Sequence, residues 1–231
     1  MTPLVLLPGM MCDARLYGPQ IAAFSGRLPI HLAPITEHGT VELLAADVLE
    51  QAPPRFALAG LSMGGIVAME ILRRSPHRVE RLALLDTNPR AEIEAVKQNR
   101  EPQIAKVQAG GLKEIMRDEL KPNYLADSPR RQDVLDLCMD MALDLGPDVF
   151  ERQSRALQSR PDQQETLKSV AVPTLILMGE EDRLCPRDRH DLMHELISGS
   201  TLEIVESAGH LPTLEQPDAV NSALMTWLDL T

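Results

Sequence analysis

The sequence predicts an α/β domain built on a mostly parallel sheet. Short apolar runs, such as 4–7 and 56–59, alternate with amphipathic stretches of helical period in the first part of the chain. Each run is apolar on both faces and ends at a breaker such as Pro8 or Gly60, the pattern of a strand buried on both sides of a parallel sheet. An alternation of strand and helix is typical of a doubly wound sheet.

The strands and helices of this core fall into two separate blocks, 1–87 and 170–231. Between them, from 88 to 169, strand-like runs disappear and helical stretches follow one another, separated by glycine and proline. The sequence therefore predicts a core domain interrupted by an all-helical insertion. We expect core strands at 4–7, 30–33, 56–59, 82–85, 173–178 and 201–205, core helices at 41–51, 64–75, 186–197 and 219–230, and insertion helices at 91–109, 112–120, 130–145 and 147–158.

Composition and net charge limit the kinds of protein that this chain can be. The chain has 231 residues, of which 44% are hydrophobic and 25% charged, enough apolar material for a packed core. Its formal net charge of −11 disfavours nucleic acid and anionic membrane surfaces as partners. We see neither a signal peptide nor an apolar run that could span a membrane, and we expect a cytoplasmic location.

The cysteines and histidines do not predict a metal site or a cofactor. Cys12, Cys138 and Cys185 are far apart and lack zinc spacing, so we expect reduced thiols. His190 and His194 stand four apart on an expected helix, which is also a metal-ligand spacing. No third ligand is evident, and we interpret the two histidines as a solvated helix face.

The segment Gly60-Leu61-Ser62-Met63-Gly64 fits the pattern G-x-S-x-G, which places a serine on a sharp turn from strand to helix. An apolar strand precedes it and an amphipathic helix follows. The turn lifts the Ser62 hydroxyl out of the sheet and sets the following amides at a helix N-terminus, where negative charge is stabilised. Ser62 is therefore the candidate nucleophile.

A serine hydroxyl needs a base, and the base needs a carboxylate to orient it. His210 follows the expected strand 201–205 and Asp182 follows the strand 173–178, so both lie at the same sheet edge as Ser62. Asp182 is our candidate acid. Other carboxyl groups that could serve are Glu180, Glu181 and Asp86.

A tetrahedral intermediate also requires amide donors for its oxyanion. We expect one donor from Met63, at the start of the helix, and a second from Met10, in the loop after the first strand. Met11 and Leu211 are candidate pocket residues. Because methionine is adaptable and aromatic residues make up only 3% of the chain, we expect a flexible, mostly aliphatic pocket.

Several segments carry a resemblance to a known superfamily. In order they are LVLLPGMMCD, FALAGLSMGGIVAMEI, RLALLDT, PTLILMGEEDRLCP and ESAGHLPTLEQPDAV. The chain resembles the α/β-hydrolase fold over nearly its full length, and especially small capped serine hydrolases such as carboxylesterases, 3-oxoadipate enol-lactonases and C–C hydrolases. The resemblance implies a triad of Ser62, Asp182 and His210, an oxyanion hole at Met10 and Met63, and a helical cap over the site.

This chain departs from that pattern in two ways. Many relatives have His-Gly where it has Pro8-Gly9, and the two antiparallel edge strands usual in relatives are not recognisable, which leaves about six strands. We expect a serine hydrolase that cleaves an ester or lactone of a small molecule. A C–C hydrolase or acyltransferase on the same triad is a second hypothesis, and a non-catalytic small-molecule receptor a third. The sequence does not indicate the oligomeric state.

Overall fold

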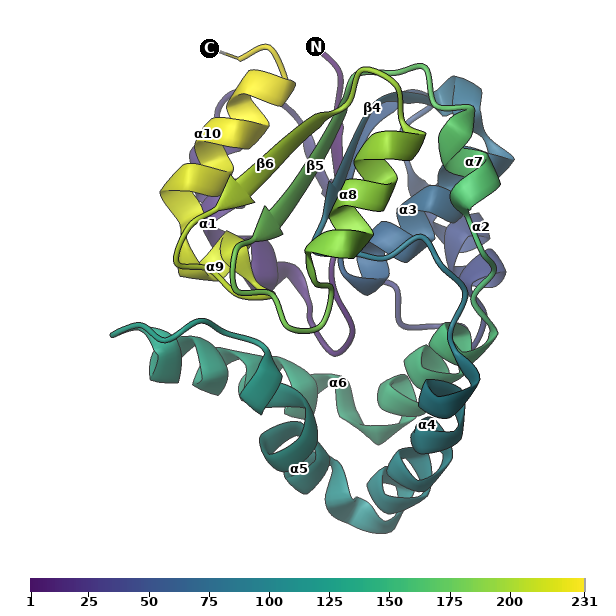
Figure 1. Cartoon of the computed structure of the whole chain (residues 1–231), viewed down its shortest axis with the longest axis vertical. Helices are drawn as coiled ribbons and strands as arrows, with labels where there is room; N and C mark the ends of the chain where they lie inside the picture. The colour runs from purple at the N-terminus through teal and green to yellow at the C-terminus, as the bar shows by residue number, and fades with distance from the viewer. Residues whose placement is uncertain (231) are drawn as a thin grey trace.

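Six parallel strands form one sheet in the computed structural model, which describes residues 1–230 (Figure 1). Their order across the sheet is β2-β1-β3-β4-β5-β6. This confirms the predicted sheet of about six parallel strands. The strands are β1 (Leu4–Leu7), β2 (Ile30–Leu32), β3 (Phe56–Leu61), β4 (Val79–Leu85), β5 (Thr174–Gly179) and β6 (Thr201–Val205).

Helices cover both faces of the sheet because successive strand residues point to opposite sides. Leu4 and Leu6 of β1 pack with Phe24 of α1 and Leu224 of α10, whereas Val5 and Leu7 pack with helices α2 and α3 on the other face. Figure 1 shows α1 and α10 on one side and α2, α3 and α8 on the other. These helices are α1 (Gly18–Phe24), α2 (Val41–Gln51), α3 (Met63–Arg74), α8 (Arg187–Leu196) and α10 (Pro217–Trp227).

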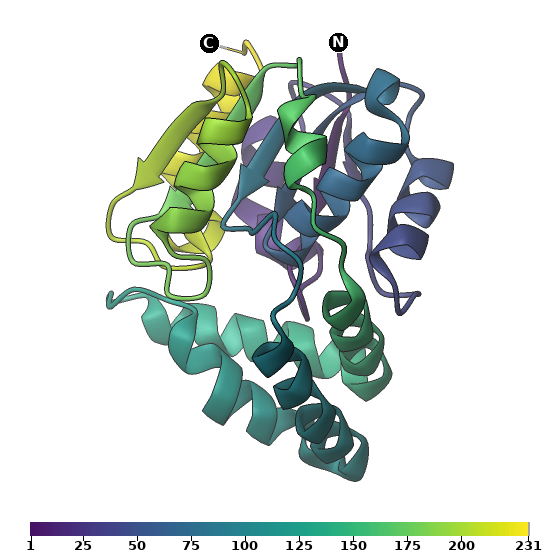
Figure 2. The same ribbon diagram turned by 45° about the vertical axis from the view of Figure 1, so that its right-hand side comes forward.

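The chain between β4 and β5 contains helices only, and we call residues 88–169 the helical segment. Residues 94–159 of it lie beyond the carboxyl ends of the strands (Figure 2), whereas its last short helix, Gln164–Lys168, packs beside α3 and α8. Its longest helical element, α6, is interrupted at Gly146, where φ is 81° and ψ is 178°, so the helices expected at 130–145 and 147–158 lie on the two sides of this kink. The segment holds α4 (Glu94–Lys106), α5 (Leu112–Ile115), α6 (Arg131–Ser159), α7 (Gln164–Lys168), π-helical turns at Val107–Gly111 and Met116–Leu120, and a 3-10 turn at Lys121–Asn123.

Short helices were harder to predict than strands and long helices. The expected helix at 41–51 and the strands at 4–7 and 201–205 match the structure residue for residue. The sequence analysis missed α1, α7, α9 (Pro212–Glu215) and the 3-10 turns at Ala14–Tyr17, Pro76–Arg78 and Lys121–Asn123. Each is a short element, so a hydrophobic period cannot be established over its length.

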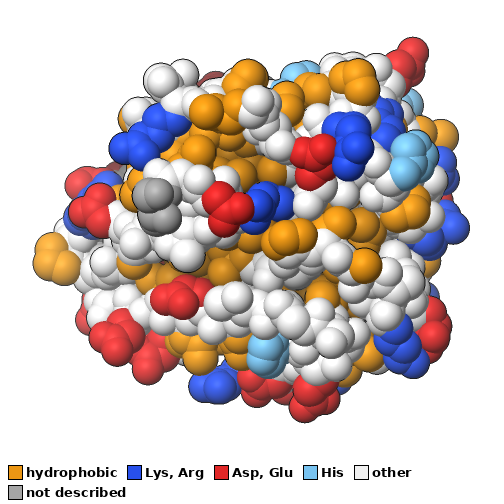
Figure 3. All heavy atoms as spheres, turned by 90° about the horizontal axis from the view of Figure 1, so that it is seen from above, with side chains coloured by type: hydrophobic (Ala, Val, Ile, Leu, Met, Phe, Trp, Pro, Cys, Tyr) orange, Lys and Arg blue, Asp and Glu red, His pale blue; other side chains and the backbone are white. Residues whose placement is uncertain are grey.

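The surface is mixed in character. Seen from the end where both termini lie, hydrophobic side chains gather between charged ones (Figure 3). None of the described helices has the length and apolarity that a membrane span requires.

Candidate active site

Ser62 lies at the turn between β3 and α3, in a backbone conformation that few residues other than glycine adopt. Its φ is 55° and its ψ is −114°. Strain of this kind costs on the order of 1–3 kcal/mol and persists only where the surroundings impose it. The turn places the hydroxyl at the carboxyl edge of the sheet, as the G-x-S-x-G pattern predicts.

Close backbone packing imposes this turn. A Cβ at Gly64 would meet the carbonyl oxygen of Leu7 closer than real Cβ contacts allow, so α3 can approach β1 only with glycine there. The Ser62 amide donates to the Leu85 carbonyl at 2.9 Å. The Thr87 hydroxyl donates to the Ser62 carbonyl at 2.7 Å. Both hydrogen bonds to Ser62 thus come from the end of β4 and the loop that follows it, while Gly64 packs against the end of β1.

His210 lies in the loop between β6 and α9 and connects two other side chains. Its Nε2 is 2.9 Å from Ser62 Oγ, and its Nδ1 is 2.9 Å from Asp182 Oδ2. The imidazole is only 4% exposed. The structure therefore brings together the three residues that the sequence suggested for the triad, in one hydrogen-bonded line.

Asp182 is held as a carboxylate. Burial raises its pKa, but the His210 imidazole and the amides of Cys185 and Leu184 outweigh this and lower the pKa below its usual value. Those amides donate to Asp182 Oδ1 at 3.0 and 2.8 Å. Because a carboxylate only accepts, His210 Nδ1 carries the proton and Nε2 is left to accept one from Ser62.

The other acidic candidates do not contact His210 in the described structure. Glu180 and Glu181 are exposed. Asp86 is fully buried and accepts from the Gly179 amide at 2.9 Å, while its second oxygen has no donor. Burial and the charge of Asp182 raise the pKa of Asp86 well above its usual range, which favours its protonated form.

Glu215, which the sequence analysis missed, holds the His210 loop. Its carboxyl oxygens accept from the amides of Gly209 and Leu211, the residues on either side of His210, at 2.9–3.0 Å. They also accept from the amide of Ala126 in the helical segment at 2.8 Å. Glu215 lies in the segment ESAGHLPTLEQPDAV that carries the family resemblance, but its sequence context gave it no role.

The expected oxyanion donors lie on either side of Ser62, in the loop after β1 and at the start of α3. The amides of Met10 and Met63 do not donate to any acceptor in the described part of the chain. The next residue, Met11, has a φ of 54°, and its amide donates to Gln153 Oε1 at 2.8 Å. Gln153 Nε2 in turn donates to the carbonyl of Ile35, so α6 fixes this loop.

A cavity of about 430 Å³ opens at the triad. Ser62, His210, Met10, Met63 and Leu211 all line it. A second hollow of about 470 Å³ lies between β5, β6 and α10 and includes none of these residues. We therefore place the candidate site in the cavity at Ser62.

Aliphatic side chains predominate in the lining, as expected, with Tyr124 as its one Phe, Tyr or Trp residue, but four arginines line it as well. Two other expectations about this region are wrong. Met11 does not line the cavity, because its amide is held by Gln153 and its side chain is fully buried. His190 is fully buried and not on a solvated helix face, and burial lowers its pKa to about 4, which keeps it neutral.

The thiols near the cavity are not activated nucleophiles. Cys12 and Cys185 both line it, and burial raises the pKa of each thiol well above its usual value. In the described chain, Asp182, Cys185 and His210 bring possible metal-ligand atoms within 4.8 Å of one another. The hydrogen bond between Asp182 and His210 already accounts for this proximity.

Comparison with known proteins places this geometry in a family. The model of a family described as the Alpha/beta hydrolase family matches residues 4–223. A pimeloyl-[acyl-carrier protein] methyl ester esterase from Salmonella newport is 29% identical over 96% of this chain and 92% of its own. A thermophilic esterase from Thermogutta terrifontis, solved with malate bound, superposes with a TM-score of 0.91 at 27% identity, covering 99% of this chain and 90% of that one.

The fold and the site together define an α/β hydrolase. The enol-lactonase from Burkholderia xenovorans LB400 has the same fold, with a TM-score of 0.88, 22% identity, and 99% and 91% of the two chains covered. The chain belongs to the alpha/beta hydrolase family, which confirms the resemblance read from its sequence.

Proposed function

We propose that the protein is a serine hydrolase that cleaves a carboxylic ester or lactone of a small molecule through an acyl-enzyme intermediate. The observation that carries this proposal is the line from Ser62 Oγ through His210 to Asp182, with both hydrogen bonds at 2.9 Å, at the cavity. The esterases among its relatives support the same chemistry.

Acylation begins when Ser62 Oγ attacks the ester carbonyl carbon. His210 Nε2 takes the serine proton as the new C–O bond forms, and the Asp182 carboxylate stabilises the resulting imidazolium. The amides of Met10 and Met63 donate to the oxyanion. When the intermediate collapses, the alkoxide leaving group takes the proton from Nε2 and departs as the alcohol.

Deacylation repeats these steps with water. His210 Nε2 accepts a proton from water while the oxygen attacks the acyl carbon, and the bond to Ser62 Oγ then breaks. Ser62 regains its proton from His210, and the acid leaves. In a lactone the alcohol and the acid are the two ends of one product.

We further propose that residues 88–169 act as a cap on a core formed by 1–87 and 170–231. Leu120 and Tyr124 of the helical segment line the cavity beside core residues. The Tyr124 carbonyl accepts from the His210 amide at 2.6 Å. Such a cap shapes the site and limits its access to water.

Substitution Ser62→Ala tests the mechanism with 4-nitrophenyl pentanoate as substrate. Without its nucleophile the enzyme should lose at least about a thousandfold in kcat/KM. Ser25→Ala, at an exposed position after α1, is the matched control and should retain wild-type activity. An alkyl phosphonate should label the peptide that contains Ser62. Wild-type rates in Ser62→Ala would refute the proposal.

A further inference from the structure

Four arginines from four different segments line the cavity at Ser62, although the chain as a whole carries a net charge of −11. The only carboxylate side chain in the lining is Glu92. An excess of positive charge in a partly enclosed hollow attracts anions. The arginines are Arg90 after β4, Arg100 on α4, Arg160 at the end of α6 and Arg189 on α8.

The two most buried arginines share Glu92. Arg160 Nη2 donates to Glu92 Oε1 at 3.0 Å, and Arg100 Nη2 donates to Oε2 at 2.8 Å. The side chains of Arg160, Arg100 and Glu92 are 9%, 15% and 7% exposed. One carboxylate cannot neutralise two guanidinium groups, so this buried cluster has a net charge of +1.

The Arg160 guanidinium has N–H donors that are free to bind a ligand. A guanidinium has five N–H donors, and within the described chain only Nη2 of the Arg160 side chain donates to an acceptor. Among residues 1–230, the buried Nε has no hydrogen-bond partner. A buried donor without an acceptor costs stability, and an oxygen of a bound ligand can supply that acceptor.

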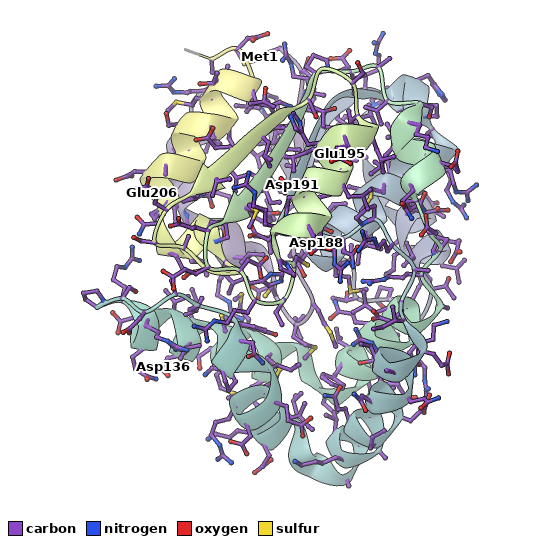
Figure 4. All side chains as sticks on the ribbon, in the orientation of Figure 1. Met1, Asp136, Asp188, Asp191, Glu195 and Glu206 are labelled. Carbon is purple, nitrogen blue, oxygen red and sulfur yellow. The ribbon has the colours of Figure 1, made fainter. Side chains whose placement is uncertain are left out.

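The other two arginines repeat this arrangement closer to solvent. Arg90 Nη1 and Arg189 Nη1 both donate to Asp188 Oδ2, at 3.2 and 3.0 Å. Their side chains are 39% and 30% exposed. Asp188 lies near the end of α8 that faces the helical segment (Figure 4). Around the cavity, four guanidinium groups therefore share two carboxylates, a net charge of +2.

We propose that this cluster binds a carboxylate carried by the substrate, so that the enzyme acts on esters or lactones with a second, free carboxyl group. The inference rests on the proposed hydrolase function. A carboxylate fits better than a phosphate dianion because the buried cluster of Arg100, Arg160 and Glu92 has one positive charge to neutralise. The exposed pair, Arg90 and Arg189, attracts the same group at the entrance.

The test compares two substrates of equal acyl length. Mono-4-nitrophenyl glutarate has a carboxylate where 4-nitrophenyl pentanoate has a methyl group. The wild-type enzyme should show the higher kcat/KM with the glutarate ester. In Arg160→Gln the ratio of the two kcat/KM values should fall about ten- to a hundredfold, mainly through a higher KM for the charged ester.

Two variants separate charge recognition from a structural role. Arg160→Lys retains the charge and should recover part of the ratio, which a merely structural loss would not. Arg155→Gln, on the same helix, removes an arginine that pairs with Glu101 and lies outside the cavity lining. It should leave the ratio unchanged.

Competitive inhibition of the wild-type enzyme tests the carboxylate proposal even if Arg160→Gln does not fold. Glutarate should inhibit hydrolysis of the pentanoate competitively, and 1,5-pentanediol should not. If the pentanoate is hydrolysed in a Ser62-dependent manner but glutarate neither inhibits nor is preferred as an ester, the carboxylate proposal is wrong while the hydrolase proposal stands. If neither ester is hydrolysed, the hydrolase proposal itself fails.

Discussion

The ends of β4 and β5 lie side by side, and an aspartate follows each strand, yet the pKa values of the two carboxyl groups shift in opposite directions. Asp182 accepts from His210 and from two amides, and its pKa is lowered in spite of burial. Asp86 accepts from one amide, and burial together with the charge of Asp182 raises its pKa. The imidazole and the additional donors at Asp182 account for the difference between these two buried groups.

A second pair of buried carboxyl groups shows that the charge of the donors matters as well as their number. Burial opposes ionisation of Glu70 on α3, but Arg73, Arg74 and Gln163 lower its pKa to about 2. Glu215 has three backbone amides and no cation bonded to it, and burial raises its pKa. Amides satisfy the oxygens of a carboxylate, whereas a guanidinium also neutralises its charge.

The largest expected effect comes from removing the charged member of the aspartate pair. Asp182→Asn preserves the size of the side chain but cannot stabilise the His210 imidazolium or enforce its tautomer. We expect kcat/KM for 4-nitrophenyl pentanoate to fall by about a thousandfold or more, with the thermal midpoint little changed. Activity within tenfold of wild type would mean that His210 relies on another carboxylate.

The second prediction concerns Glu70 and stability. Because its pKa is lower in the folded protein than the ordinary value of 4.5, its contribution is complete above pH 4.5 and is lost as the pH falls toward 2. This difference corresponds to about 3 kcal/mol. In denaturant titrations, wild type should exceed Glu70→Gln by up to this amount at pH 7, and the two should converge near pH 2.

The control for Glu70 is an exposed glutamate with a similar sequence environment. Glu165 pairs with Lys168 but is 86% exposed, and surface pairs of this kind contribute little. Glu165→Gln should therefore follow wild type at every pH. If Glu165→Gln and Glu70→Gln lose stability equally, burial does not distinguish the two sites.

The third prediction tests Glu215 as a positioning residue. An amide at this position has one acceptor oxygen in place of two, so Glu215→Gln leaves at least one of the amides of Gly209, Leu211 and Ala126 unpaired. We expect kcat to fall about tenfold, KM to change little, and stability to drop by roughly 1–3 kcal/mol. A loss of stability without any change in kcat would restrict Glu215 to a structural role.

The sequence predicted the core and the triad for identifiable physical reasons. The strands β1, β3 and β5 are buried on both faces, so their apolar runs are distinct from the amphipathic helices between them. Ser62, Asp182 and His210 each follow a strand, and a parallel sheet brings these strand ends to one edge.

The residues that the sequence did not reveal act through contacts between distant segments. Gln153 on α6 reaches the loop after β1, and Glu92 is shared by arginines from two other helices. Such contacts depend on how the helical segment packs on the core, and no local period or motif encodes that packing. For the same reason the sequence predicted the aliphatic part of the pocket but not its four arginines, which come from four separate segments.

The smallest expected effect provides the sharpest test of the aspartate pair. If Asp86 is protonated at neutral pH, Asp86→Asn is nearly isosteric with it, because the amide oxygen accepts from Gly179 and the amide nitrogen donates as the carboxyl proton would. Activity should therefore stay within about fivefold of wild type, in contrast to Asp182→Asn. Asp86→Ala should behave differently: it leaves the buried Gly179 amide without an acceptor and should cost roughly 1–3 kcal/mol in chemical denaturation. A loss of activity in Asp86→Asn as large as that in Asp182→Asn would show that both carboxyl groups are charged, and the distinction between these two strand ends would be wrong.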